Sequence, residues 1–418
     1  MNKLPFSRIN KRTLLLALVC GVLLLVVVFG IVIKSVSASG SPSHSTGIHQ
    51  GPTQLPSASA SATANSSDLV VSSQSITPTT TLSPKGTGTP TTSGTATGTS
   101  IPVPTYPSSP SGSTSIYFGV HVAYDSLSYI TSFEADARKA VSIVMWYQQW
   151  GLTNGWQYIQ TYWMNEVRAH GSIPLITWDP QDPSNGTANQ LAYALQNIIN
   201  GNFDGYITQW AQESKAWGHP YFLRFAHEMN GNWNPWSEQV NGNKPGQFVL
   251  AWRHVHDIFT RLGVTNVTWV WSPNIDFSTS TPLQELYPGD GYVDWVGMSG
   301  YNWGPFGQWH VWQSFSSVFS QTYNDILHIT SRPIMITETA STELGGNKAN
   351  WISDAFVTQL PHNFPHIHAF VWFDESKEED WRIESSPSAQ AAFAAAISSP
   401  IYSSNTFGGI SASPIPPL

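Results

Sequence analysis

Phe222-Leu223-Arg224-Phe225-Ala226-His227-Glu228 is a short apolar run that ends in two ionisable side chains. Near-continuously apolar runs of this length are typical of parallel strands that are covered on both faces. Eight such runs occur in the second part of the chain, at Tyr117–Val122, Val141–Tyr147, Ile173–Trp178, Tyr221–Ala226, Val267–Trp271, Val293–Met298, Pro333–Thr337 and Ala369–Phe373.

Helical patterns separate these runs. Gln247–Leu262 repeats apolar residues at helical spacing, and Asn350–Leu360 is a second candidate. Eight strand–helix units predict an α/β fold of the (β/α)8 TIM barrel type. We expect this domain to span 116–403 and residues 404–418 to form a flexible tail.

The chemistry of such a barrel lies just past the carboxyl ends of its strands. Glu228 and Glu338 follow the fourth and seventh runs most closely, and these two strand ends face each other across the barrel mouth. The polar or aromatic residues at strand ends are Tyr124, Asp125, Gln148, Gln149, Asp179, His227, Glu228, Asn230, Asn274, Asp276, Tyr301, Asn302, Glu338, Asp374 and Glu375.

A pair of carboxyl groups suits the cleavage of a glycosidic bond. One delivers a proton to the leaving oxygen, and the other supplies negative charge to an oxocarbenium-like carbon. At a separation of about 5–5.5 Å the second carboxylate attacks the sugar, and the anomeric configuration is retained. Arg224 and His227 could support either glutamate, and the sequence leaves that choice open.

Other chemistries fit less well. A zinc motif H-E-x-x-H that starts at His227 needs a second histidine where Gly231 stands. The G-x-S-x-G elbow of serine hydrolases does not occur in the sequence. A metal-dependent hydrolase that uses Asp and His at the mouth, and a non-catalytic carbohydrate-binding wall protein on an inactive barrel, remain as alternatives.

The ten residues Arg224–Trp233 resemble the acid/base motif of glycoside hydrolase family 26. This clan A family of retaining (β/α)8 enzymes is best known for β-mannanases and includes β-1,3-xylanases and mixed-linkage glucanases. Ile336–Glu338 is similar to the nucleophile strand of the family, and Ser299–Trp303 to its sixth-strand segment. The resemblance covers roughly 116–400, whereas Phe118–Val122 and Trp146–Gln149, which help to form the distal subsites, depart from typical mannanases.

The resemblance implies a role for each matching residue. Glu228 would be the acid/base and Glu338 the nucleophile of an endo-acting double displacement, with no cofactor and no metal. The substrate would be a plant-type polysaccharide, with β-1,4-mannan first and mixed-linkage β-glucan or xylan, including β-1,3-xylan, behind it. The remaining implied roles are polar support by His227 and Tyr301, aromatic walls at Trp233 and Trp372, and a further stacking face at Trp178. Beside these, we expect Arg224 to support a carboxylate and Asn230 to contact the substrate.

The composition of the chain indicates which classes of binding partner it suits. The net charge is −8, 11% of the residues are charged, and no basic patch suits a phosphate backbone, so we expect no nucleic-acid partner. The 19 tryptophans are many even after core packing is allowed for, and flat aromatic faces suit a neutral ligand such as a sugar. A single cysteine, Cys20, excludes an intrachain disulfide. We expect a monomer.

The amino-terminal part predicts export. Basic residues in 1–12 precede the uncharged apolar run Leu14–Ile33, which is long enough to cross a bilayer once with its start inside. A retained anchor over 13–34 is favoured, and a signal peptide cleaved after Val36-Ser37-Ala38 is the alternative. Residues 35–115 are rich in Ser, Thr and Pro and predict a disordered linker. The catalytic domain would therefore be extracellular, either membrane-anchored or secreted.

Overall fold

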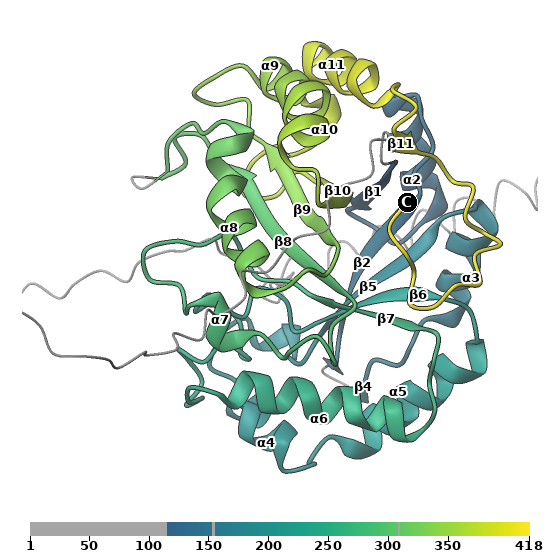
Figure 1. Cartoon of the computed structure of the whole chain (residues 1–418), viewed down its shortest axis with the longest axis vertical. Helices are drawn as coiled ribbons and strands as arrows, with labels where there is room; N and C mark the ends of the chain where they lie inside the picture. Colours follow the sequence, from purple (N-terminus) through teal and green to yellow (C-terminus); the bar gives the residue numbers. More distant parts are fainter. Residues whose placement is uncertain (1–114, 153–154, 308–309) are drawn as a thin grey trace, which may run out of the picture.

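The computed structural model describes residues 115–152, 155–307 and 310–418. Its central element is a closed barrel of eight parallel strands, in which β1 pairs with β2 on one side and β10 on the other (Figure 1). In chain order the strands are β1 Ile116–Val122, β2 Ile143–Gln149, β5 Ile173–Asp179, β6 Tyr221–Phe225, β7 Val267–Trp271, β8 Trp295–Asn302, β9 Ile334–Ser341 and β10 Ile367–Asp374.

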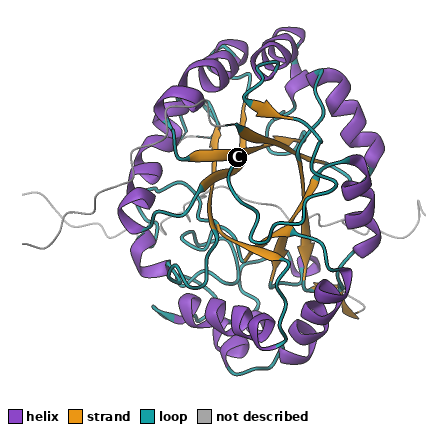
Figure 2. Ribbon diagram, turned by 45° about the vertical axis from the view of Figure 1, so that its right-hand side comes forward, coloured by secondary structure: helices purple, strands orange, loops and turns teal. Residues whose placement is uncertain are grey.

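Helices form a ring outside the strands (Figure 2). They are α2 Leu127–Ala137, α3 Thr161–His170, α4 Leu195–Ile199, α5 Asp204–Trp217, α6 Gln247–Arg261, α7 Leu283–Leu286, α8 Phe315–Ile329, α9 Lys348–Ser353, α10 Leu360–Asn363 and α11 Pro387–Ile397. A π-helical segment, η3 Asp354–Gln359, joins α9 to α10. The smaller elements are the hairpin β3 Gly151–Leu152 and β4 Gly155–Trp156, the strand β11 Tyr402–Ser403, and the 3-10 turns η1 Pro183–Asn185, η2 Leu191–Tyr193 and η4 Ile383–Ser385.

The predicted barrel is confirmed, and all eight apolar runs are strands. Strands β8 and β9 continue furthest beyond the apolar runs that predicted them, because they go on pairing with each other as far as Asn302 and Ser341. Tyr301 and Glu338 therefore belong to strands and not to loops, which holds their side chains on a rigid frame. In the described part of the chain no helix is long and apolar enough to cross a membrane, and the predicted anchor lies outside the described residues.

Both predicted helices are present. The apolar residues of α6 at Phe248, Trp252, Val255 and Phe259 are buried, as their spacing of three and four residues requires. The second prediction, Asn350–Leu360, corresponds to α9, η3 and the start of α10, a helical stretch widened by π-type turns.

Two layers of apolar side chains stabilise the barrel. Alternate strand residues point inward, and their neighbours point outward against the helices. Trp295 belongs to the inner layer, whereas Trp269 and Trp271 pack in the outer one, so all three serve as packing residues, as predicted. The inner layer also holds Tyr117, Ile143, Met145, Ile173, Leu175, Phe222, Val270, Met335, Ala369 and Val371.

The prediction of a flexible tail over residues 404–418 is wrong, because this segment packs across the amino-terminal end of the barrel. Ile415 is 1% exposed and joins the inner layer. Its N–H donates to Thr268 Oγ1 at 2.8 Å, and its carbonyl accepts from Trp295 Nε1 at 2.8 Å. The Tyr117 hydroxyl donates to the Pro416 carbonyl at 3.1 Å. The segment closes the end of the barrel opposite the site.

We expect Ile415→Ala to lower the free energy of unfolding by about 2–5 kcal/mol, since a buried side chain is removed and its space cannot refill completely. Denaturant unfolding of the full chain measures the change. Leu250→Ala is the matched control, because Leu250 is 54% exposed on α6. Equal stability of the two variants would contradict the packing described for residues 404–418.

Candidate active site

Glu228 and Glu338 meet at the mouth of the barrel. Glu228 lies three residues past β6, and Glu338 is the fifth residue of β9. Both residues are buried, at 5% and 3% exposed. One carboxylate oxygen of each glutamate and one ring nitrogen of His227 all lie within 4.8 Å of one another. The two carboxylates are therefore close enough to act on the same bond.

Neutral donors hold the Glu228 carboxylate. Trp233 Nε1 donates to one oxygen at 2.8 Å, and Asn274 Nδ2 donates to the other at 3.0 Å. Asn230 in turn fixes Asn274, because its amide donates to the Asn274 carbonyl and accepts from the Asn274 N–H. Both of these hydrogen bonds to Glu228 therefore come from neutral side chains.

The backbone around Glu228 is left-handed at two positions. Ala226 has φ 46° and Glu228 has φ 53°, a region that L-residues other than glycine adopt rarely and at a cost in energy. Hydrogen bonds to the neighbouring strands offset this cost, since Ala226 N–H donates to Trp178 O and Glu228 N–H donates to Ser272 O. This turn directs the Glu228 side chain over the barrel mouth.

Gly231 gives Trp233 its place beside Glu228. A Cβ atom on Gly231 would stand 2.4 Å from Trp233 Cη2, closer than any real contact, so a side chain here would push the indole away. Trp233 is half-buried and packs against Phe277, with ring centroids 5.5 Å apart. One wall of the candidate site, beside the Glu228 carboxylate, is therefore aromatic.

A cation and a phenol hold the Glu338 carboxylate. Arg224 donates to one oxygen, and the Tyr301 hydroxyl donates to the other at 2.6 Å. Arg224 is itself held by Ser299 Oγ at 2.6 Å and Thr177 Oγ1 at 3.3 Å. Burial, the largest single influence, acts to lower the pKa of Arg224, but the charge and hydrogen bond of Glu338 together with the nearby Tyr147 and Glu228 raise it above its usual value, so the guanidinium stays charged. The choice that the sequence left open for Arg224 is settled in favour of Glu338.

Tyr147, at the end of β2, completes this side of the site. Burial, followed by the Glu338 charge, raises the pKa of Tyr147 well above its usual value, and the same two causes raise that of Tyr301. Both phenols therefore remain protonated donors at neutral pH. The two glutamates thus differ in surroundings, with positive charge and phenols at Glu338 and neutral N–H donors at Glu228, and such a difference separates an anionic nucleophile from a proton donor.

His227 is neutral and fixed. Its side chain is fully buried, and its Nδ1 lies 2.8 Å from Asp179 Oδ1. Burial, and next the Arg224 charge, lower the pKa of His227 to about 4. With Asp179 Oδ1 accepting from the Nδ1–H of the neutral ring, Nε2 is the acceptor nitrogen. The backbone carbonyl of His227 accepts from Trp236 Nε1 at 2.6 Å, which further fixes its position.

We expect His227 to make stability depend on pH. Its folded pKa is below the value of about 6.5 in an unfolded chain, so between pH 6.5 and 4 only the unfolded chain binds this proton. Stability is therefore lost as the pH falls through this window, by at most about 1.4 kcal/mol per pH unit. His227→Asn keeps a donor near Asp179 and should show a shallower slope in denaturant unfolding at pH 4 to 7. An unchanged slope would remove His227 from this role.

Comparison with known proteins agrees with this geometry. The sequence profile of glycosyl hydrolase family 26 matches residues 107–328, more than half of the chain. The chain belongs to glycosyl hydrolase family 26. This is the family that the motifs around Glu228 and Glu338 resemble.

Several named proteins are similar in sequence to this family 26 chain. Endoglucanase H of Acetivibrio thermocellus is 41% identical over 278 residues, 65% of this chain and 29% of that protein. A mannan endo-1,4-beta-mannosidase of Bacillus subtilis is 28% identical over 179 residues, 40% of this chain and 43% of that protein. Beta-1,3-xylanase TXYA of a Vibrio species is 31% identical over 108 residues, 25% of this chain and 22% of that protein. The chain thus spans less than half the length of each.

Solved structures share the barrel. GH26C from Muricauda sp. MAR_2010_75 superposes with a TM-score of 0.52 at 19% identity, covering 70% of this chain and 88% of that one. The Bacillus subtilis mannanase man26 gives a TM-score of 0.50 at 16% identity, covering 67% and 85%. At these identities the likeness concerns the fold.

Two aromatic predictions for the family 26 site are wrong. Trp178 and Trp372 are 0% exposed and face the outer helices. Trp178 stacks on Trp210 of α5 at 4.6 Å, and Trp372 packs against Phe393 of α11 at 5.0 Å. Neither ring has a free face for a sugar. Asn230, which was predicted to contact substrate, is also buried and uses its amide to hold Asn274.

Three residues of the site were not among the predicted ones. Asn274 binds Glu228, Ser299 binds Arg224, and Tyr147 lies beside Glu338. Asn274 already stood among the polar residues at strand ends, so its position was the available signal. Tyr147 is the last residue of an apolar run and Ser299 directly follows another, where aromatic or small side chains look like packing.

Proposed function

We propose that this chain is a retaining endo-β-glycanase in which Glu338 is the nucleophile and Glu228 the acid/base. The observation that carries the proposal is the spacing of the two carboxylates, with oxygens within 4.8 Å. Retaining enzymes hold their carboxyl groups about 5–5.5 Å apart, whereas inverting enzymes need about 6.5–9.5 Å to admit a water. Proton NMR of the first product formed tests this proposal, because retention predicts that the β-anomer appears first and α forms only by later mutarotation.

The surroundings of the glutamates support the same assignment. Arg224 and Tyr301 stabilise the anionic form of Glu338, which an attacking carboxylate needs. The Arg224 guanidinium also disfavours a metal ion at this carboxylate, because two cations would compete for the same oxygen. Activity that is unchanged by a chelator is the expected result, and its loss and recovery on metal addition would support the metal-dependent alternative.

For the substrate we propose a β-glucan ahead of mannan. Endoglucanase H has the highest identity among the relatives described, 41%, over 65% of this chain. The sequence also departs from typical mannanases at Phe118–Val122 and Trp146–Gln149, on β1 and β2. A reducing-end assay of the full chain on lichenan, galactomannan, xylan and β-1,3-xylan tests this order, and lichenan is expected to be degraded fastest.

β-1,4-Mannan is the second candidate. Two mannan endo-1,4-beta-mannosidases from Bacillus subtilis match this chain at 28% and 26% identity. If galactomannan is degraded faster than lichenan, mannan replaces β-glucan as the proposed substrate. A chain that binds these polymers yet degrades none of them would be the non-catalytic wall protein considered above.

We also propose that the chain is exported and remains anchored at its amino terminus. The support is the apolar run Leu14–Ile33 after a basic segment, followed by a Ser-, Thr- and Pro-rich stretch. Fractionation of cells that express the full chain, followed by amino-terminal sequencing of the product, tests this. Recovery of a soluble extracellular chain that begins near residue 39 would favour a cleaved signal peptide instead.

A further inference from the structure

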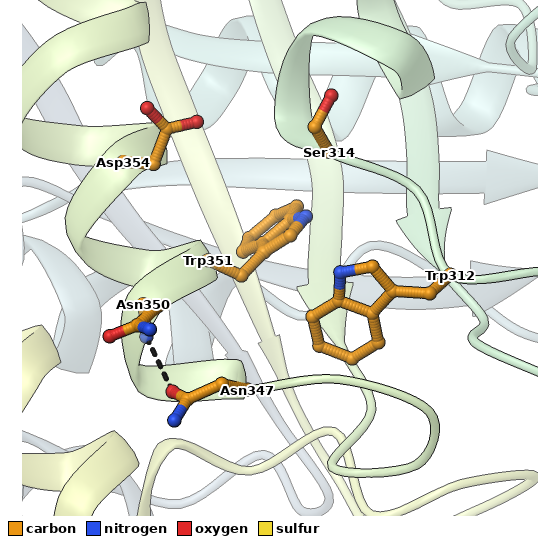
Figure 3. A pocket seen from close by; sticks show the side chains of 6 residues that line it. All are labelled: Trp312, Ser314, Asn347, Asn350, Trp351 and Asp354. Carbon is orange, nitrogen blue, oxygen red and sulfur yellow. Dashed lines mark hydrogen bonds between the residues drawn. The ribbon is translucent and has the colours of Figure 1, made fainter.

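A second pocket lies outside the catalytic centre, between the beginnings of α8 and α9 (Figure 3). Its volume is about 320 Å³, at the lower end of the range for small-molecule sites. It follows β8 and β9, the strands that carry Tyr301 and Glu338, and so belongs to the same end of the barrel. The pocket is lined by Trp312, Ser314, Asn347, Asn350, Trp351 and Asp354.

Two tryptophans give this pocket a rigid aromatic surface. Trp312 is half-buried, and its ring lies against Gly346, where a Cβ atom would stand 2.2 Å from Trp312 Cε2. Trp351 is buried at 4% exposed and donates from Nε1 to the Gln313 carbonyl at 3.0 Å. It also packs against Phe315 at 5.7 Å. The two indoles are therefore held in place before any ligand arrives.

Planar polar groups border these rings. Asn347 Oδ1 accepts from the Asn350 N–H at 2.8 Å, which anchors the Asn347 side chain at the start of α9. Asn350 is exposed, and one oxygen of Asp354 accepts from Gln359 Nε2 at 3.1 Å. The six lining residues include one carboxylate and no lysine or arginine, so the pocket does not suit an anion. Amide and carboxylate edges beside an indole face suit the hydroxyl groups and apolar ring face of a neutral sugar.

We propose that this pocket is a secondary binding site for a sugar unit of the polysaccharide substrate. The inference rests on the proposed function, because the enzyme meets a polymer whose chain supplies many identical units. A polymer that binds this pocket and the mouth of the barrel at once is bound in two places, so its local concentration at the catalytic glutamates rises. A short substrate cannot reach both places and gains nothing from the pocket.

The test compares the full chain with Trp312→Ala and Asn350→Ala in affinity electrophoresis through gels that contain lichenan or galactomannan. We expect Trp312→Ala to weaken retardation by the preferred polymer roughly tenfold and Asn350→Ala to weaken it less. The kcat/KM of Trp312→Ala on the polymer should fall as its retardation weakens. Its kcat/KM on a short aryl glycoside should equal that of the wild type, because a short substrate gains nothing from the pocket. Val311→Ala is the matched control, because Val311 is 66% exposed beside Trp312 and does not line the pocket.

The outcomes separate this inference from the proposed function. Equal retardation and equal polymer kinetics of the wild type, Trp312→Ala and Asn350→Ala would overturn the secondary site while the glycanase activity stands. A wild type that degrades nothing but is retarded in a Trp312-dependent way would keep the site and overturn the proposed function. Thermal unfolding of each variant shows whether it is folded, and Asn350→Ala, on an exposed side chain, serves if Trp312→Ala is not.

Discussion

Replacing Glu338 with alanine is expected to lower kcat on the polysaccharide by on the order of 10⁴-fold or more. The variant lacks the carboxylate that would attack the sugar, and Arg224 and Tyr301, which hold that carboxylate, are donors that cannot act as the nucleophile in its place. A reducing-end assay at saturating substrate measures the loss. Glu285→Ala, on an exposed residue of α7, is the matched control and should keep full activity.

Azide distinguishes a missing nucleophile from a damaged site. The small anion can enter the space left by the Glu338 side chain and attack the sugar from that side. With an activated aryl β-glycoside, Glu338→Ala should regain activity as azide is added, and the product should be the α-glycosyl azide, of inverted configuration. A β-glycosyl azide, or residual hydrolysis equal to that of the wild type, would show that another group is the nucleophile.

Some stability loss should accompany this change. Arg224 is 0% exposed, and Glu338 is the carboxylate at its hydrogen-bond distance in the described site. Removing one partner of a buried pair leaves an uncompensated charge, which costs about 3–5 kcal/mol. Glu338→Gln keeps the shape and an oxygen acceptor, so it should be the more stable variant while remaining equally inactive.

The barrel and its two glutamates could be predicted from the sequence because their signals are local. Strands covered on both faces must be apolar over their whole length, and this pattern alone marked all eight. The ten residues around Glu228 form one turn whose geometry restricts which residues fit. Gly231 is an example, because a larger residue there would displace Trp233 from the carboxylate. These constraints are imposed within a few residues, so they are visible in a single sequence.

The sequence-based prediction that Trp178 and Trp372 point into the site is wrong, although a simple rule gives their direction. Side chains alternate along a strand, so neighbours point to opposite faces. Thr177 and Asp179 both reach residues of the site, which requires Trp178 between them to point outward. In β10, Val371 belongs to the inner layer and Trp372 to the outer one. An aromatic residue at a strand end therefore faces the site only where the alternation of the strand places it there.

The packing of residues 404–418 could not be predicted in the same way. Their composition is that of a linker, and their apolar residues Phe407, Ile410 and Ile415 are too widely spaced to indicate a strand or helix. Their partners are strand starts more than a hundred residues away, such as Thr268 and Trp295. Only the closed barrel brings these partners together into a surface that such a segment can cover.

Glu228→Ala should impair the enzyme in a way that depends on the leaving group. On a polysaccharide the departing sugar hydroxyl needs a proton, and loss of general acid catalysis should lower kcat/KM by about 10²–10⁴-fold. On a dinitrophenyl glycoside the leaving group departs without a proton, so formation of the glycosyl-enzyme should be nearly as fast as in the wild type. The second step still lacks its base, so a burst of dinitrophenol followed by slow turnover is expected in stopped-flow traces.

A second variant, Asn274→Ala, tests the surroundings of Glu228. Asn274→Ala removes one of the two donors to this carboxylate but leaves the acid itself. It should therefore lower kcat/KM on the polymer less than Glu228→Ala and show no burst, because the base for the second step remains. If Glu228→Ala slowed both substrates equally and gave no burst, Glu228 would be a structural residue. The proton would then have to come from a different group at the mouth of the barrel, and His227 could not supply it, because with its pKa lowered to about 4 it carries no spare proton at neutral pH.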